Sequence, residues 1–547
     1  MGKGEDSREL FERLKRAGDV LDRFSAVLQK SVAHTCGDGR SDSGQHLTHG
    51  LAWYATTIHA FRETANWLTA GISAGTLGAG GLLTGRILAG ELLAECRGGV
   101  PMHQLEIIRP QDFDLPEDVL ALLRDEAIDG LIRDSIAASS REQLIGLLAQ
   151  GGSGAAGFGY EDDAEAGIMA QETQRFAADR IAPYAHSWHL GNAYIPEDVI
   201  KGLADLGVFG ISVAGGYGGS DAGKIAMCAV TEALSHAYIG AGSLGTRSEI
   251  AAELIQSCGR DDQRQRWLPE IAAGEILPAA AFTEPEAGSD LAAVRCRAVR
   301  EGDDYVINGS KIWITHAARS DLLTLLVRTD PDSPGYRGLS MLLVEKPRGD
   351  DANPFPLPGM SGSEIEVIGY RGMKEYEIGF DDCRVPASSL LGDAEGLGFR
   401  QLMQTFETAR IQTAARAAGV TRAALDLSVA YATERRQFGK ALIAFPRVVN
   451  KIVRMATEVL AARLLTLAAA RAKDAGRRCD LEAGMAKLYA AKAAWSAADG
   501  AVQIYGGNGF ALESPVSRLL CDARILSIFE GAAEIQAQII ARRLLEE

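Results

Sequence analysis

Clustered cysteines are missing from this 547-residue chain. No two of them form a CxxC pair, the arrangement from which zinc and iron–sulfur sites are commonly built. The chain is also long for a disulfide-stapled protein, because disulfide frameworks are typical of small secreted domains. We therefore expect no metal site, no disulfide framework and a cytoplasmic location. The eight cysteines are scattered at positions 36, 96, 228, 258, 296, 383, 479 and 521.

Long basic runs and a targeting leader are missing as well. The formal net charge is −16 and no basic tail is present, so we expect no nucleic-acid partner. The N-terminus, MGKGEDSRELFERLKR, is charged and holds no apolar core, which argues against a signal peptide. Residues 210–223 are glycine-rich, but no strand–GxGxxG–helix unit surrounds them, so we do not interpret them as a dinucleotide site.

One uncharged stretch, residues 67–85, is long enough to span a bilayer. It contains six glycines and is followed by Arg86. Gly71 and Gly75 have the GxxxG spacing of closely packed helices. We expect tight helix packing within a bundle and no membrane span.

Length and apolar content predict several folding units. The chain exceeds one ordinary domain, and 47% of its residues are hydrophobic, which is ample core material. Residues 1–148 carry apolar side chains near the helical period, and we expect a helical N-terminal extension there. Residues 149–163, AQGGSGAAGFGYEDD, are expected to form a Gly-rich linker.

Three further units are expected after this linker. Residues 164–280 have a helical pattern, punctuated by Pro183. Residues 281–395 contain strand-like runs separated by Gly, Pro and Asp, which predict a small β-barrel or sandwich. Residues 396–547 return to long, Ala-rich helices that suggest a four-helix bundle. The expected fold class is mainly α with a central β-domain.

Close to the C-terminus, the sequence IFEGAAEIQ at 528–536 places Glu530 among small and apolar residues. A poorly solvated carboxylate is a stronger base toward a buried substrate. Taken alone, such a residue is more often an acid that favours the start of a helix. Three other segments change this interpretation.

The first of them, AFTEPEAGSD at 281–290, alternates turn formers with hydroxyls and can direct backbone N–H groups at a phosphate or a ring edge. The second, KIWITHA at 311–317, is a strand-like run with a large aromatic and a hydroxyl. In the third, QIYGGNGF at 503–510, paired glycines end a helix and allow close approach of a ligand.

In this order and spacing, the four segments resemble the acyl-CoA dehydrogenase family of FAD-dependent flavoproteins. The resemblance covers roughly residues 160–547 and includes ATERRQFGK at 432–440. It implies an acyl-CoA dehydrogenase-like fold, with the residues before it as an extra helical extension. It also implies loss of an α-proton and a β-hydride from an acyl-CoA thioester. Glu530 matches the family's usual base, and the alternative position in the family is Ala409 here, which cannot act.

The resemblance also implies a set of flavin contacts. Phe282 and Thr283 match residues at the edge of the ring, Thr315 matches a hydrogen-bond donor near N5 or O4, and Trp313 would cover one ring face. A plain core position in the barrel is the alternative for Trp313. His316 replaces the Asn that is common in the family. The other residues that match cofactor contacts are Gly288, Ser289, Arg436, Phe438, Gln503, Gly506 and Gly507.

Some of these contacts cross a subunit boundary in the family. Arg436, Phe438 and Gln503 match residues that reach the FAD of a neighbouring subunit, which implies a homodimer or a dimer of dimers. Ser289 matches a residue that reaches phosphate or pantetheine, and Phe406 and Arg410 match the helix that contacts CoA. A structural salt bridge is the equally weighted alternative for Arg410.

Arg247 is an unusual cation in a segment, SLGTRSEIA, that lines the acyl pocket in the family. A buried cation needs an anionic partner. That partner is either Glu249 or Glu253, or a second carboxylate on the substrate.

The whole chain most resembles the branch of the family that oxidises (2S)-methylsuccinyl-CoA to mesaconyl-CoA (2-methylfumaryl-CoA) in the ethylmalonyl-CoA pathway. This resemblance implies an electron-transferring flavoprotein as acceptor. The alternatives are a short or branched monocarboxylic acyl-CoA dehydrogenase, a glutaryl-CoA dehydrogenase, or a non-catalytic flavin-binding module. The exact acyl group, the role of the extension and the reactivity with dioxygen do not follow from the sequence.

Overall fold

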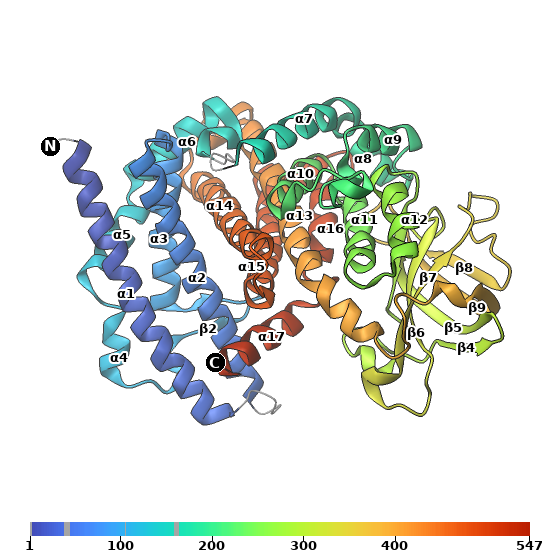
Figure 1. Cartoon of the computed structure of the whole chain (residues 1–547). Coiled ribbons are helices and arrows are strands. Elements are labelled where there is room, and N and C mark those ends of the chain that lie inside the picture. The colour runs from blue at the N-terminus through green and yellow to red at the C-terminus, as the bar shows by residue number, and fades with distance from the viewer. Residues whose placement is uncertain (1–2, 38–43, 104, 158–162, 547) are drawn as a thin grey trace. The chain divides into compact units, whose positions relative to one another are not determined.

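The computed structural model describes residues 3–37, 44–103, 105–157 and 163–546. By internal packing the chain divides into two compact units (Figure 1). The first consists of Met1–Gly167 and Thr413–Glu547, and the second of Ile168–Gln412. The first unit therefore joins the two ends of the sequence.

The N-terminal part of the first unit is helical, as the apolar periodicity predicts. Its short strands β1 (Val100–Pro101) and β2 (Ile107–Ile108) form an antiparallel hairpin. Its helices are α1 (Lys3–Cys36), α2 (Gln45–Ala74), α3 (Ala79–Gly98), α4 (Glu117–Leu122), α5 (Glu126–Ile136) and α6 (Ala138–Gly151).

The C-terminal part of the first unit supplies the long helices against which this extension packs. Helices α2 and α3 pack on α14, and α2 also packs on α17 (Figure 1). The hairpin of β10 (Arg436–Gln437) and β11 (Lys440–Ala441) precedes α14. The helices are α13 (Gly398–Glu434), whose first part belongs to the second unit, α14 (Pro446–Asp474), α15 (Asp480–Tyr505), α16 (Pro515–Ile525) and α17 (Ala533–Glu546).

The uncharged stretch at 67–85 is divided between two helices. Helix α2 ends at Gly75, which has φ 71° and donates its N–H back to Ile72, a common way for glycine to end a helix. Helix α3 begins four residues later. None of the helices in the described ranges combines the length and apolar character of a bilayer span.

The second unit combines helices with one sheet. The sheet is seven-stranded, in the order β3-β6-β4-β5-β9-β8, and β7 pairs with β6. Pro183 lies in the first turn of α8. The helices are α7 (Ala164–Arg180), α8 (Ala182–Leu190), α9 (Glu197–Asp205), α10 (Gly223–Ala237), α11 (Ile239–Cys258) and α12 (Asp261–Ala272), and the strands are β3 (Pro278–Ala281), β4 (Arg297–Glu301), β5 (Asp304–Thr315), β6 (Leu322–Arg328), β7 (Leu339–Glu345), β8 (Met360–Ile365) and β9 (Glu375–Pro386).

Two strands of this sheet are buried on both faces. Strands β6 and β7 are buried along nearly their whole length, as expected for strands covered on both faces. One apolar cluster joins them to α11 and α12, and a second lies on β5 and β9. The predicted fold class, mainly α with a central β-domain, is confirmed.

The Gly-rich segment predicted as a linker at 149–163 is ordered over its first part. Helix α6 continues to Gly151 and is followed by η3 (Gly152–Ala156), while residues 158–162 lie outside the described residues. The Asp426 carboxylate accepts hydrogen bonds from the Ser153 backbone N–H (2.7 Å) and hydroxyl (2.9 Å). A Cβ at Gly80 would lie 1.6 Å from the Ala155 carbonyl oxygen, so glycine is required at this contact. Residues 149–157 are therefore fixed by contacts within the first unit, and the linker and the domain boundaries stay a prediction.

Candidate active site

Glu530 lies in the loop between α16 and α17, in the first unit. The backbone of the loop turns back on α16, where Ile528 and Phe529 donate their N–H groups to the Ile525 carbonyl at 2.8 and 3.1 Å. Glu530 has φ 56°, a left-handed conformation that costs a non-glycine residue about 1–3 kcal/mol. Such a conformation persists only where the surroundings enforce it, and it is characteristic of functional positions.

The Lys487 ammonium restrains the backbone on both sides of Glu530, and the Gln536 side chain lies against Gly531. Lys487, on α15, donates from its ammonium to the Phe529 carbonyl at 2.8 Å and also to the Gly531 carbonyl. Gly531 has φ 92°, and a Cβ there would lie 2.1 Å from the amide nitrogen of Gln536, which is fully buried. The carbonyls on both sides of Glu530 therefore point to one ammonium, and the next residue has to be glycine.

Arg416, on the part of α13 that belongs to the first unit, lies beside the Glu530 carboxylate. Its guanidinium nitrogen is 3.6 Å from Glu530 Oε1, and its carbon lies 4.8 Å from the centre of the Phe529 ring. It also donates to the Thr413 hydroxyl at 2.8 Å. The Arg416 side chain is fully buried and that of Glu530 is 13% exposed. The Arg416 guanidinium thus places a positive charge beside the Glu530 carboxylate.

The residues matched to the flavin edge lie in the second unit, on and beside strand β5. The strand predicted at 311–317 is confirmed up to Thr315, but its pairing with β9 shifts register between Lys311 and Ile314. Trp313 sits in this bulge with φ 61°, and its side chain is 53% exposed. Bulges aim side chains out of the regular alternation and are common beside active sites. Trp313 is therefore not a core residue of the sheet, which removes that alternative.

A buried ion pair brings the AFTEP turn to the same strand. Lys311 Nζ is 2.8 Å from the Glu284 carboxylate and donates to the Phe282 carbonyl at 3.1 Å, and its side chain is fully buried. Burial lowers the pKa of the Lys311 ammonium, and the Glu284 charge opposes this shift. The Ile312 N–H donates to the Thr283 carbonyl at 2.9 Å. Phe282 and Thr283 are therefore fixed beside the bulge.

Thr315 directs its hydroxyl at a carboxylate. It faces Glu375 across the β5–β9 ladder and donates to both carboxylate oxygens, at 2.9 and 3.1 Å. Both side chains are buried. The expected donation from Thr315 to a flavin stays a prediction, and it requires the hydroxyl to turn away from Glu375.

The remaining residue of this strand end that the sequence singled out, His316, is buried with φ 63°. Burial lowers its pKa to about 4, and the hydrogen bond to the Met373 carbonyl (3.3 Å) opposes this shift. His316 is therefore a neutral ring packed edge-on against Tyr194 at physiological pH.

The polar turn at Gly288 and Ser289 is exposed. A Cβ at Gly288 would meet only a methyl of Thr283, at 3.9 Å, so the backbone there is open to a ligand. This accessibility fits the predicted phosphate or pantetheine contact without testing it.

The residues matched to the adenosine diphosphate of FAD lie in the first unit. Arg436 and Phe438 are in the β10–β11 hairpin, where Phe438 has φ 51° and is 93% exposed. Gln503 is exposed near the end of α15, and Gly506 and Gly507 follow the helix with open space around them.

Two stacked tyrosines hold the end of α15. Tyr431 and Tyr505 stack with ring centres 3.9 Å apart, and each donates its hydroxyl to a backbone carbonyl. Exposed backbone N–H groups and an exposed arginine suit a pyrophosphate. The exposed Arg436 and the open turn at Gly506 and Gly507 are therefore compatible with a phosphate-bearing cofactor.

Arg247 lies on α11 and is only 9% exposed. Both carboxylates considered as its partners contact another cation, because Lys224 Nζ pairs with Glu249 and lies 3.7 Å from Glu253. Phe406 and Arg410 lie one turn apart on α13, with the Arg410 guanidinium 5.7 Å from the centre of the Phe406 ring. Arg410 is 8% exposed.

Sequence reasoning missed three residues: Lys487 and Arg416 beside Glu530 in the first unit, and Glu375 beside Thr315 in the second. Lys487 and Arg416 are charged residues within apolar runs, and such residues are almost never buried without a partner, whereas Glu375 stands in the mixed run MKEYE. That signal was present in the sequence, although the partner cannot be read from it. No cluster of three or more potential metal ligands occurs among the described residues.

Three family models match consecutive parts of the chain and together cover most of it. The acyl-CoA dehydrogenase N-terminal domain matches residues 163–275, the middle domain residues 279–383 and the C-terminal domain residues 396–545. These limits lie close to the predicted units at 164–280, 281–395 and 396–547.

Similar proteins extend this finding. The chain is 54% identical to a (2S)-methylsuccinyl-CoA dehydrogenase of Cereibacter sphaeroides, over 98% of this chain and 99% of the relative. A chain in a structure of the electron transferring flavoprotein of Acidaminococcus fermentans has a TM-score of 0.66 and 32% identity, covering 70% of this chain and 97% of that one. A glutaryl-CoA dehydrogenase from Mycobacterium smegmatis in complex with FADH2 has a TM-score of 0.65 and 27% identity, covering 70% and 95%.

Proposed function

The chain belongs to the acyl-CoA dehydrogenase family, and from this premise we propose that it oxidises (2S)-methylsuccinyl-CoA to mesaconyl-CoA. The reaction removes the α-hydrogen of the thioester as a proton and a β-hydrogen as a hydride. The observation that carries the reaction is the Glu530 loop, a carboxylate in an enforced left-handed turn beside a buried guanidinium. The choice of substrate is supported by the near full-length relative, whose similarity includes the N-terminal extension.

Each step assigned to the chain is a binding or proton-transfer step. Glu530 takes the α-proton on a carboxylate oxygen, and Arg416 supplies the counter-charge until the proton arrives. Flavin is the hydride acceptor in this family, and we propose FAD as its form.

The proposed contacts to the flavin are assigned residue by residue. Phe282, Thr283, Thr315 and the exposed face of Trp313 would contact the ring, and the bulge in β5 presents that face. An aromatic cover excludes water from a reacting centre. The other proposed contacts are Gly288, Ser289, Arg436, Phe438, Gln503, Gly506 and Gly507.

Replacement of the base tests the mechanism. Glu530→Gln keeps the shape and removes the base, so we expect flavin reduction by methylsuccinyl-CoA to slow by roughly 10²–10⁴-fold, with FAD and substrate still bound. Stopped-flow reduction of the purified, yellow holoenzyme gives the rate. Reduction at the wild-type rate would move the base elsewhere, with Glu407 as the next candidate, and a colourless protein that gains no flavin would reject the mechanism.

The substrate assignment has its own test at Arg247. We propose that Arg247 binds the distal carboxylate of the substrate, and Phe406 and Arg410 contact the CoA. A charged hydrogen bond contributes roughly 1.5–3 kcal/mol, or about ten- to hundredfold in kcat/KM. Arg247→Met should lower kcat/KM for methylsuccinyl-CoA and leave that for butyryl-CoA unchanged or higher. An equal loss for both thioesters would indicate a structural role.

Partners and location complete the proposal. We propose that electrons pass to an electron-transferring flavoprotein, and turnover with a ferricenium acceptor compared with dioxygen tests this. We propose a homodimer or a dimer of dimers, because Phe438 is almost fully exposed and a second subunit would bury this apolar side chain. A cytoplasmic location is consistent with eight free cysteines.

A further inference from the structure

We propose that Lys487 is a positioning residue of the base: its ammonium, by binding the carbonyls on both sides of Glu530, fixes the backbone conformation that aims the carboxylate. This inference rests on the proposed function of Glu530 as base. It assigns a role in the reaction to a lysine that binds the backbone of the Glu530 loop.

The first step of the argument is the conformation of the loop. Glu530 and Gly531 are consecutive residues with positive φ, 56° and 92°. For a glutamate this conformation is unfavourable in isolation, so without a restraint the loop would move to a conformation that points the carboxylate elsewhere. An energetic restraint on the backbone is therefore a restraint on the base.

The second step is the geometry of that restraint. Lys487 Nζ donates to the Phe529 carbonyl at 2.8 Å and to the Gly531 carbonyl, so the two acceptors bracket Glu530. The lysine is 1% exposed. A buried ammonium that loses its acceptors is costly, and the two carbonyls would lose their shared donor. The three groups therefore hold one another in place.

The third step is the rigidity of the support. Lys487 lies in the first half of α15, and its neighbours Met485, Ala486 and Leu488 are buried. A site is most accurately held when its supporting groups sit on a packed helix, and misplacement of a reacting group by about 1 Å can cost 10²-fold in rate. Because its ammonium donates to the carbonyls of Phe529 and Gly531, Lys487 acts on the direction of the base.

The test compares two lysines on the same helix. Lys492 lies five residues further along α15, donates to the Pro101 carbonyl and lies 5.1 Å from the centre of the Trp53 ring. Both lysines bind backbone carbonyls within the first unit, but only Lys487 binds the Glu530 loop. Lys487→Met and Lys492→Met are therefore matched variants, each removing one ammonium and keeping the shape of the stem.

Stopped-flow reduction of the holoenzyme by methylsuccinyl-CoA, as a function of substrate concentration, separates the limiting rate from the substrate dissociation constant. For Lys487→Met we expect a limiting rate about 10- to 100-fold lower and a dissociation constant within about twofold of wild type. For Lys492→Met we expect both to stay at the wild-type values. Equal losses in the two variants, or a wild-type rate in Lys487→Met, would overturn the proposal.

A double variant distinguishes positioning of the base from a general loss of structure. In Glu530→Gln there is no base to aim, so adding Lys487→Met should cause no further loss of rate. Multiplication of the two losses would reject the proposal. A wild-type rate in Glu530→Gln alone would reject the proposed base instead, so the two failures are distinguishable.

Two further variants keep the proposal testable if Lys487→Met does not fold. Lys487→Gln keeps a donor and removes the charge, and it should lie between wild type and Lys487→Met. Gly531→Ala strains the same loop from the other side, because its Cβ would meet Gln536. It should lower the limiting rate in the same way, and a wild-type rate in Gly531→Ala would count against the role of this conformation.

Discussion

The buried side chain of His316, directly after β5, is expected to make the stability of the protein depend on pH in the acid range. Burial lowers the pKa of His316 from 6.5 to about 4, with the hydrogen bond to Met373 opposing and the charges of Arg319 and Arg348 adding to the shift. Between these pH values the unfolded chain binds a proton that the folded chain does not. Stability therefore rises with pH through this window, and His316 contributes fully only above about pH 6.5.

Replacement of this histidine should flatten the dependence. From pH 7.5 to pH 5 we expect His316 to account for about 2 kcal/mol of lost stability. His316→Asn should lose less stability over that interval than wild type, as measured by urea unfolding at both pH values. A parallel loss in both proteins would contradict the assignment, and His59, whose burial also lowers its pKa to about 4, offers a matched comparison.

The Glu375 carboxylate determines whether the Thr315 hydroxyl can donate a hydrogen bond to another group. As long as it accepts the hydroxyl hydrogen, Thr315 presents only oxygen lone pairs to other groups. Glu375→Gln removes a negative charge near the proposed ring edge, so we expect a higher flavin midpoint potential, with about 30 mV for each 1.4 kcal/mol in a two-electron couple. Redox titration of the holoenzyme measures it, and an unchanged potential would place the flavin away from Thr315.

At the scale of single residues, the sequence predicts the kind of side chain at a position but not its orientation or its partner. The run KIWIT predicts a strand, and a strand is found, but the bulge that exposes Trp313 has no signal in composition. Glu249 binds Lys224, which is 25 residues away in the chain, and no local pattern indicates this pair. Contacts between distant residues depend on packing, which a local pattern does not contain.

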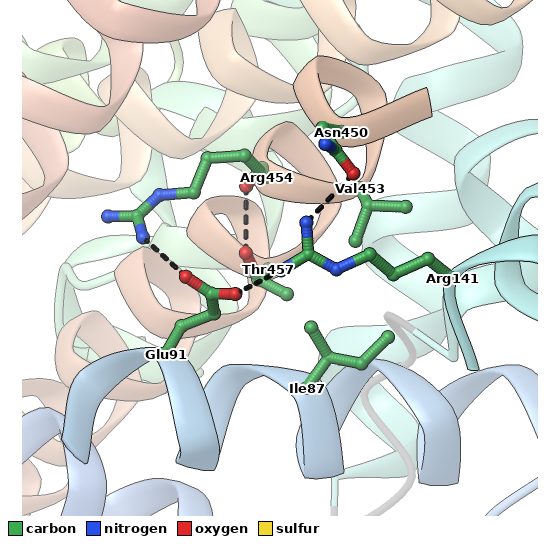
Figure 2. Close-up of a pocket in the computed structure, with 7 residues that line it drawn as sticks. All are labelled: Ile87, Glu91, Arg141, Asn450, Val453, Arg454 and Thr457. Atoms are coloured by element: carbon green, nitrogen blue, oxygen red, sulfur yellow. Dashed lines mark hydrogen bonds and ion pairs between the residues drawn. The ribbon is translucent and has the colours of Figure 1, made fainter. Parts of the chain in front are cut away.

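Among the elements, α3, α6 and α14 meet around a small polar cavity within the first unit. Glu91 on α3 binds Arg141 of α6 with one carboxylate oxygen and lies 3.5 Å from Arg454 of α14 with the other (Figure 2). Arg454 also pairs with Glu95 and, at 2.8 Å, with Glu458. Charged groups from the N-terminal extension and the C-terminal helices thus satisfy one another.

This network should make the extension an integral part of the unit. Arg454→Met leaves three carboxylates without their shared cation, and we expect a loss of roughly 1–3 kcal/mol, since Arg454 is partly exposed. Arg62→Met, which removes an exposed pair between α2 and α1, is the control and should cost under about 1 kcal/mol. Urea unfolding midpoints measure both, and equal shifts would indicate that the cavity network adds nothing.

Helices with a clear apolar period were predictable, and their ends were less so. The extension is helical as expected. The break at Gly75 in the uncharged stretch is a local glycine cap, whereas the ordered turn at Ser153 follows from its contact with Asp426. Glycine-rich composition is typical of both flexible linkers and close backbone contacts, and only the position of Gly80 against Ala155 decides between them.

For the whole molecule, exposed apolar side chains predict self-association. Phe438, Phe510 and Leu512 of the first unit are 93%, 90% and 74% exposed. We expect a dimer or larger assembly by sedimentation, and Phe438→Asp should weaken it and lower FAD occupancy. Ile136→Asp, at an exposed position on α5, is the control and should change neither. A wild-type monomer with full FAD would contradict the prediction.

The first unit is built from two stretches of chain that residues 168–412 separate. On the ribosome, α2 and α3 emerge long before α14 and α17, whose surfaces they cover. The second unit can fold as it emerges, whereas the extension has to wait with apolar faces uncovered until synthesis ends. Such waiting intermediates are prone to aggregate. The order of the segments thus delays completion of the first unit until its C-terminal helices have been made. The loop that carries Glu530 is among the last parts to form.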